Sequence, residues 1–252
     1  MKLNDHDRAP LLAGLCGVAG LSWAYLIFQD WAMRHMDVVE MAMPSLDEWG
    51  MADLFLVFSM WAIMMVAMML PSVTPVVLLF EKVSRRYRAQ HRSASATWAF
   101  LLGYLTIWTC FSLLATAGQW WLHHLSLISP GMVASNRTLA GTLLILAGTY
   151  QWSSLKNACL AHCRSPLDFL ILRWRPGGWG ALRMGFTHGL YCTGCCWLLM
   201  ALLFVVGVMN LAWIVVLSAL VLAEKVIPRG IWLARVSGIL LASWGVWLVS
   251  TT

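Results

Sequence analysis

Long apolar stretches separated by short polar segments dominate the pattern of this 252-residue chain. A helix needs roughly 20 apolar residues to cross the hydrocarbon core of a bilayer, and several stretches approach that length with few charges. Backbone amides find no partners in lipid, so such stretches must be helical. The short alternating segments of a membrane barrel are not seen. We therefore predict an all-α fold, a polytopic transmembrane helical bundle.

The predicted spans share length, apolar content and polar flanks. They are about Leu11 to Phe28, Leu54 to Phe80, Trp98 to Leu122, Leu139 to Leu155, Met184 to Val208, Leu211 to Ala223 and Ile231 to Val249. The sixth is short, and could continue to the break at Pro228 with Lys225 reaching toward lipid head groups. Seven spans are predicted, with six as the alternative. The polar gaps are too short for a soluble domain, so residues 1–252 are taken as one integral membrane domain.

Composition and charge agree with this topology. Hydrophobic residues make up 60 % of the chain and charged residues 11 %, against about a quarter charged in soluble domains. With a cytoplasmic N-terminus, all Lys and Arg except Arg34 and Arg137 fall on the inner side, as the positive-inside rule requires. The net charge of +6 then reflects orientation, not nucleic-acid binding. The predicted location is the cell membrane, multi-pass, in a bacterial inner membrane, with the lipid bilayer as partner.

The first span is expected to stay in the mature protein. Its leader mixes acidic and basic residues, and no small-residue cleavage pattern follows it. Between the fourth and fifth spans, the segment from Leu167 to Trp174 is predicted to be a short interfacial helix, ended by Pro176.

Five of the seven cysteines fall in two groups, each with a histidine. They are Cys192, Cys195 and Cys196 with His188 on the fifth span, and Cys159 and Cys163 with His162 at the end of the fourth. Residues four apart lie on one helix face, so each group points one way. Thiolates and imidazoles close together suit Zn(II), Cu(I) or an iron–sulfur cluster. Cys16 and Cys110 sit alone in apolar spans, where packing explains them.

Methionines on the second span tilt the choice of metal toward copper. Met64 and Met68 share one face, and Met65 and Met69 a neighbouring one. Thioethers are poor ligands for Zn(II) and good ones for Cu(I). The same run would also serve simply to fill gaps between apolar helices.

Two further polar features lie nearer the ends of the spans. A possible outer metal site combines methionines and histidines from two loops: His35, Met36, Met41, Met43, His123 and His124. The alternative for its histidines is solvation at the interface. Glu224 and Lys225 are predicted to form an ion pair at the inner edge, although a carboxylate inside the membrane is also a functional candidate.

Three motifs carry a resemblance to a known family. They are Trp61-x-x-Met64-x-x-Ala67-Met68-Met69-x-Pro71, Lys156-x-x-Cys159-Leu160-x-x-Cys163-Arg164-x-Pro166, and Gly185-x-x-His188-Gly189-x-x-Cys192-x-Gly194-Cys195-Cys196-Trp197. On these residues the chain resembles the predicted metal-binding integral membrane proteins also called domain of unknown function 2182. The resemblance implies metal binding and specifies no reaction or substrate.

These residues favour a membrane protein that holds, transports or delivers Cu(I), with a copper enzyme or a metallochaperone as possible partner. No catalytic residue is predicted, and a non-enzymatic role is favoured. Zinc, an iron–sulfur cluster or haem stay open as cofactors. The alternative function is a membrane thiol-disulfide oxidoreductase that uses Cys192-x-x-Cys195. The pattern leaves open whether the two cysteine groups form one site or two, since helix tilt shifts relative depth.

Overall fold

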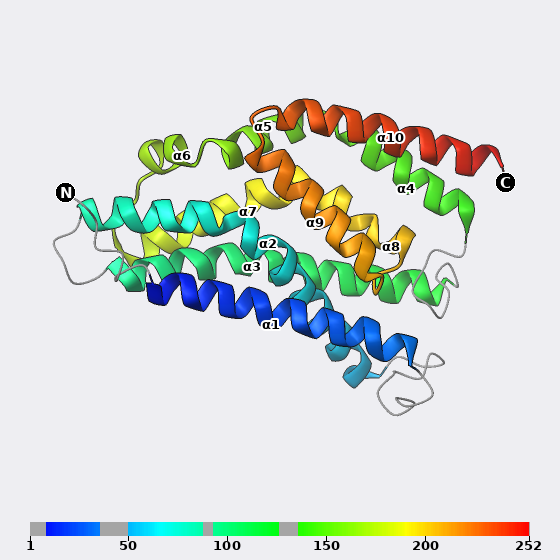
Figure 1. The fold of residues 1–252 in the computed structure, drawn as a ribbon, viewed down its shortest axis with the longest axis horizontal. Coiled ribbons are helices and arrows are strands. Elements are labelled where there is room, and N and C mark those ends of the chain that lie inside the picture. Colours follow the sequence, from blue (N-terminus) through cyan, green and yellow to red (C-terminus); the bar gives the residue numbers. More distant parts are fainter. Residues whose placement is uncertain (1–8, 36–49, 88–92, 126–135, 252) are drawn as a thin grey trace.

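The computed structural model describes residues 9–35, 50–87, 93–125 and 136–251, and within these ranges all regular structure is helical. Figure 1 shows that the axes of the long helices lie roughly along the longest axis of the molecule. Five of them are long and apolar enough to cross a membrane. The predicted all-α class is therefore confirmed.

The helices follow one another along the described ranges. In chain order they are α1 (Ala9–Arg34), α2 (Met51–Tyr87), α3 (Ser93–His124), α4 (Arg137–Tyr150), α5 (Ser154–Arg164), α6 (Pro166–Leu172), α7 (Gly177–Ala201), α8 (Leu203–Val206), α9 (Leu211–Val226) and α10 (Gly230–Ser250). The short helix predicted between the fourth and fifth spans is α6.

Helices lie at all seven predicted spans, but two of them are short. The span-length helices are α1, α2, α3, the α7–α8 unit and α10. By contrast, α4 has 14 residues and α9 has 16, below the roughly 20 that a perpendicular crossing needs. The count of seven spans and the side of the N-terminus stay predictions.

The fourth predicted span is interrupted by a turn. It was expected to run from Leu139 to Leu155, but α4 ends at Tyr150. The Ser153 side chain then accepts a hydrogen bond from the Lys156 backbone N–H and caps a new helix. This break starts α5 in a new direction, so its cysteines and histidine are not an extension of the fourth span.

Glycines let the central helices approach closely. A Cβ at Gly185 of α7 would clash with the backbone of Phe100 on α3, and one at Gly103 of α3 would clash with that of Leu182. On the opposite side of the bundle, Gly148 of α4 and Gly238 of α10 face each other in the same way. Small residues at helix crossings are typical of packing inside membranes.

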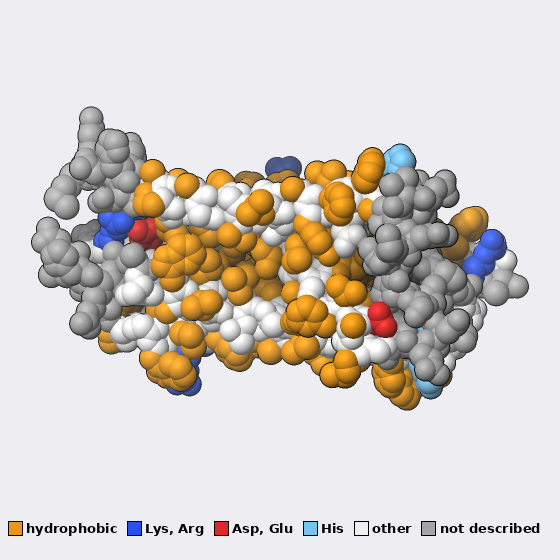
Figure 2. All heavy atoms as spheres, turned by 90° about the horizontal axis from the view of Figure 1, so that it is seen from below, with side chains coloured by type: hydrophobic (Ala, Val, Ile, Leu, Met, Phe, Trp, Pro, Cys, Tyr) orange, Lys and Arg blue, Asp and Glu red, His pale blue; other side chains and the backbone are white. Residues whose placement is uncertain are grey.

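The centre of the bundle is formed by α2, α3 and α7, while α1 and α10 lie at the edge. In the most apolar window of each helix, 61 % of α2 residues are buried, against 22 % in α1 and 17 % in α10. On the face shown in Figure 2, hydrophobic side chains fill the middle and most charged side chains lie toward the two ends. This distribution fits a bundle surrounded by lipid.

Candidate functional site

The three cysteines of α7 point into the bundle. Cys192, Cys195 and Cys196 are each only 1 % exposed. The thiols of Cys195 and Cys196 both donate to the Cys192 carbonyl oxygen, each at 3.0 Å. By contrast, Cys16 and Cys110 are exposed on their helices. The shared helix face predicted from the spacing is thus an interior face.

A fourth thiol reaches this group from another helix. Cys163 of α5 is buried, and its thiol is in polar contact with that of Cys195. Polar contacts continue from Cys195 to Cys196 and from Cys196 to Cys192. We call these four residues, Cys163, Cys192, Cys195 and Cys196, the thiol cluster. Sulfur atoms from two separate helices therefore meet inside the bundle.

Cys159 lies beside the cluster and packs against a glycine of α7. A Cβ at Gly194 would lie 2.8 Å from the Cys159 sulfur, so a larger residue there would displace that side chain. The glycine between the two cysteine positions of α7 thus has a packing role: it permits the close approach that brings Cys163 to Cys195.

A buried ion pair fixes α5 in this position. The Lys156 ammonium lies 2.7 Å from the Glu224 carboxylate of α9, and both side chains are almost completely buried. Gln151, in the turn after α4, donates to the other Glu224 oxygen at 3.0 Å. The predicted ion pair between Glu224 and Lys225 is therefore wrong, since the carboxylate is paired with Lys156.

Lys225 instead points at the thiol cluster. Its ammonium donates to the Cys192 sulfur at 3.0 Å and to the Ser72 hydroxyl at 3.1 Å. Successive residues on a helix project about 100° apart, so Glu224 faces α5 while Lys225 faces α2 and α7. The expectation that Lys225 reaches toward head groups is also wrong, because α9 crosses these helices and turns this side chain inward.

A tyrosine completes the surroundings of Cys192. The Tyr104 hydroxyl of α3 lies 3.0 Å from the Cys192 sulfur and also donates to the Met69 carbonyl at 3.4 Å. Groups from two other helices thus contact the Cys192 sulfur of α7: Tyr104 from α3 and Lys225 from α9, whose ammonium also donates to Ser72 of α2.

The α2 segment beside Cys192 contains a proline, Pro71, inside the continuous helix. Pro71 has no N–H, so the Ala67 carbonyl four residues earlier loses its helical partner. That carbonyl accepts a hydrogen bond from the Trp23 indole of α1 at 3.1 Å. Satisfying a freed carbonyl in this way allows a proline inside a membrane helix.

The four methionines of α2 lie in the core. Met64, Met65, Met68 and Met69 are at most 1 % exposed. The contact between Tyr104 and the Met69 backbone puts the end of this run at the level of Cys192. Their role as metal ligands stays a prediction.

The two histidines predicted with the cysteines differ. His188 of α7 is 3 % exposed, and its Nδ1 finds no hydrogen-bond partner in the described part of the chain. The ring lies within electrostatic range of Cys195. His162 of α5 instead stacks on the Tyr191 ring, with centroids 4.2 Å apart, and contacts the Ala158 carbonyl through Nδ1 at 2.8 Å. Of the two, only His188 is buried beside the cysteines of α7, and its role as a ligand stays a prediction.

The predicted outer site is only partly described. Met36, Met41 and Met43 lie outside the described residues. His35 stacks on Trp31 and His124 stacks on Trp120. His123 follows at the end of α3. The outer metal site therefore stays a prediction.

Across the described ranges, no group of three or more His, Cys, Asp or Glu side chains is arranged to hold a metal ion. The thiol cluster nevertheless brings soft sulfur donors together, and their role as metal ligands stays a prediction.

Three residues that surround the cluster were not singled out as site residues from the sequence. Lys156, Ser72 and Tyr104 each place a polar group inside an apolar helix bundle. Polar and ionisable groups at such depth are costly and mark functional sites. That signal was present in the sequence for Ser72 and Tyr104, which lie inside predicted spans, but not for Lys156, which follows the predicted end of the fourth span at Leu155.

Comparison with known proteins identifies the family of this chain. No curated protein and no solved structure matches this chain. The copper chaperone family PpoB2 matches residues 58–248, a range that contains the entire thiol cluster and the groups around it. The copper-related part of the sequence hypothesis is thereby supported. This chain belongs to the PpoB2 copper chaperone family.

Proposed function

We propose that this protein is an integral membrane copper chaperone that carries Cu(I) on the thiol cluster. The observation that carries the proposal is the polar contact between Cys163 of α5 and Cys195 of α7. Two thiols from different helices can bind one metal ion without help from the remaining cysteines. Membership of a copper chaperone family supports copper as the cargo.

The chemistry of the cluster favours Cu(I). Thiols and thioethers are soft donors that select Cu(I), whereas carboxylates and carbonyls suit harder ions. Copper binding releases the thiol protons, because the thiolate is the ligand. His188, with its unpartnered Nδ1, and the Met64, Met65, Met68 and Met69 side chains are the further candidate ligands.

Lys225 balances the charge that copper binding creates. Two thiolates around one Cu(I) carry a net negative charge, which is costly in an apolar interior unless a cation lies nearby. The Lys225 ammonium lies 3.0 Å from the Cys192 sulfur and within electrostatic range of Cys195 and Cys196. The Tyr104 hydroxyl lies 3.0 Å from the Cys192 sulfur and can turn its single hydrogen from the Met69 carbonyl to the Cys192 thiolate.

The arrangement of the thiols suggests transfer by ligand exchange. Polar contacts connect Cys163, Cys195, Cys196 and Cys192 in that order. An ion bound to two neighbouring sulfurs can gain a third before it leaves the first, so it need not pass through lipid unligated. A copper enzyme or a metallochaperone would receive or supply the ion at one end of this series.

The alternative function, a thiol-disulfide oxidoreductase, would use Cys192 and Cys195. The family match does not favour it. Trapping with a thiol alkylator in cells separates the two: an oxidoreductase pair shows a substantial disulfide fraction, whereas a copper carrier keeps its thiols reduced.

Copper stoichiometry tests the proposal. The protein is purified in detergent with ascorbate and copper, excess metal is removed, and bound copper is measured. We expect the wild type to hold copper, the triple variant Cys192→Ser, Cys195→Ser and Cys196→Ser to lose it, and the control Cys16→Ser with Cys110→Ser to retain it. A wild type with no more copper than the triple variant would overturn the proposal.

A further inference from the structure

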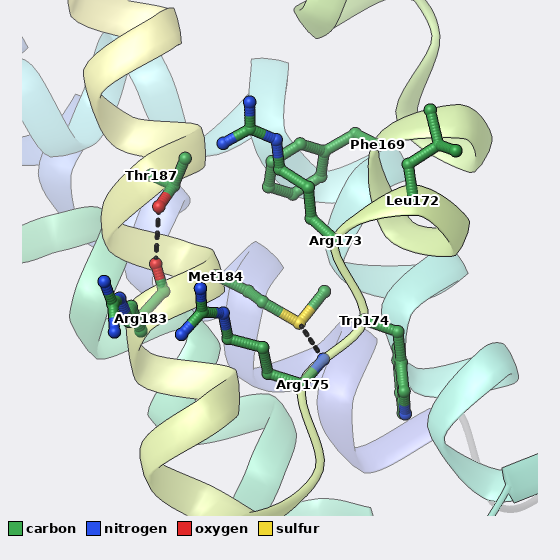
Figure 3. A pocket seen from close by; sticks show the side chains of 8 residues that line it. All are labelled: Phe169, Leu172, Arg173, Trp174, Arg175, Arg183, Met184 and Thr187. Atoms are coloured by element: carbon green, nitrogen blue, oxygen red, sulfur yellow. Dashed lines mark hydrogen bonds between the residues drawn. The ribbon is translucent and has the colours of Figure 1, made fainter.

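A cavity of about 340 Å³ lies between α6 and the first half of α7, apart from the thiol cluster. Figure 3 shows that three arginine side chains, Arg173, Arg175 and Arg183, surround it. Among the described residues, no acidic side chain lines it: the other lining residues are Phe169, Leu172, Trp174, Met184 and Thr187. The cavity therefore carries a concentrated positive charge.

The guanidinium groups are free to bind an anion. Among the described residues, neither Arg175 nor Arg183 has an ion pair, and both side chains are exposed. Arg173 lies over the Tyr191 ring, 5.7 Å from its centroid. The Thr187 hydroxyl donates to the Arg183 carbonyl at 2.9 Å, so recognition of a ligand falls to the arginines.

The loop that carries two of these arginines is held in place. The Arg175 backbone N–H donates to the Met184 sulfur at 3.4 Å, a contact visible in Figure 3. Trp174 packs on Phe80 of α2, with ring centroids 5.6 Å apart. A fixed loop holds Arg173 and Arg175 close to Arg183 of α7.

Exposed apolar side chains flank the cavity. Leu172 is 83 % exposed, Ile171 60 % and Trp179 79 %. Apolar and aromatic groups beside arginines are the pattern of a surface at the boundary between head groups and acyl chains. This surrounding favours a ligand with both a charge and a hydrocarbon part over a free ion.

We propose that this cavity binds the phosphate of an anionic phospholipid. Arginine recognises phosphate oxygens through paired N–H donors, and basic pockets between membrane helices hold anionic head groups. Arg175 and Arg183 contact the phosphate, and the acyl chains lie along Leu172 and Ile171. The inference rests on the proposed membrane location and is independent of copper.

Lipid retention measured by native mass spectrometry tests it. The delipidated protein in detergent receives dioleoylphosphatidylglycerol, dioleoylphosphatidylcholine or inorganic phosphate in separate arms. The test variant is Arg175→Gln with Arg183→Gln. The control is Lys82→Gln with Arg229→Gln, which removes the same charge from two exposed positions outside this cavity.

We expect the wild type and the control to prefer phosphatidylglycerol over phosphatidylcholine. The test variant should lose affinity for phosphatidylglycerol on the order of thirtyfold, since each cation near an anionic head group contributes about fivefold. If the double variant is not recovered folded, each single variant gives the same test, with about fivefold expected loss.

Equal phosphatidylglycerol affinity in the wild type and the test variant would overturn the site. If inorganic phosphate displaces phosphatidylglycerol at equal concentration, the assignment of the cavity to a lipid is overturned. Copper stoichiometry on the same samples should not change, so failure of this inference is distinguishable from failure of the copper proposal.

Discussion

Two lysines inside the bundle differ in the partner that each one meets. Lys156 is completely buried and pairs with the Glu224 carboxylate at 2.7 Å. Lys225, the residue after Glu224, is partly buried and faces the Cys192 sulfur at 3.0 Å, with no carboxylate paired to it among the described residues. The first lysine has a permanent opposite charge. The second faces a thiol, which becomes negative only when it releases its proton to water or to a base, as it does when a metal ion binds.

This difference assigns the two lysines to different roles. A closed ion pair with a satisfied carboxylate positions helices, here α5 against α9. An ammonium beside a thiol stabilises the thiolate, which forms when a metal ion binds. The structure therefore predicts that Lys156 governs stability and Lys225 governs copper binding.

Removal of one partner from the closed pair should have the largest effect. Lys156→Met leaves the Glu224 carboxylate buried without a cation, which costs about 3–5 kcal/mol in the free energy of unfolding. Thermal unfolding in detergent measures the loss. Adding Glu224→Gln to Lys156→Met should recover most of the stability, because the uncompensated charge is gone. A stable single variant would show that the pair does not hold α5 in place.

Removal of the second lysine should instead affect copper. Lys225→Met is expected to lower Cu(I) affinity at least tenfold, equivalent to about 1.4 kcal/mol, while the free energy of unfolding changes far less than in Lys156→Met. Competition with a Cu(I) chelator measures the affinity. Lys225→Arg keeps the charge and should retain most of the binding. Equal copper affinity in the wild type and Lys225→Met would contradict the assigned role.

The two cysteines of α5 provide a matched pair. Cys163 contacts the Cys195 thiol, whereas Cys159 packs on Gly194. We expect Cys163→Ser to lower Cu(I) affinity about fivefold, a loss of about 1 kcal/mol, and Cys159→Ser to change it less than twofold. The same chelator competition compares them. A larger loss of Cu(I) affinity in Cys159→Ser than in Cys163→Ser would show that Cys163 is not the ligand that α5 supplies.

Tyr104 should give the smallest effect. Tyr104→Phe removes a hydrogen bond to the Cys192 sulfur and leaves the ring packing intact. A single hydrogen bond contributes about 0.5–1.5 kcal/mol, so Cu(I) affinity should fall about threefold. The control is Ser112→Ala, which removes a buried hydroxyl on the same helix. That hydroxyl donates to the Trp108 carbonyl of α3. Equal Cu(I) affinity in Tyr104→Phe and Ser112→Ala would show that the Tyr104 hydroxyl takes no part in copper binding.

Periodicity predicted the parts of the molecule that depend on a single helix. The spacing of His188, Cys192 and Cys196 places them on one face of α7, and that face is buried. Apolar length likewise predicted a helix at every expected span. These properties follow from local sequence, because the period of a helix is fixed.

Properties that depend on two helices were not predictable in the same way. The apolar pattern runs through Trp152 to Leu155, yet Gln151 turns inward to Glu224 and Ser153 caps a new helix. The choice of partner for Glu224 and Lys225 depends on how α9 crosses α2 and α5, which no single-helix pattern contains. The predicted ion pair between these neighbours was wrong for that reason.

X-ray absorption at the copper edge of the Cu(I)-loaded protein tests the central claim most directly. The account predicts Cu(I) with sulfur neighbours in the wild type, and loss of both the bound copper and the sulfur signal when Cys163 and Cys195 are both replaced by serine. Copper surrounded only by nitrogen and oxygen, or an unchanged sulfur signal in that double variant, would contradict it.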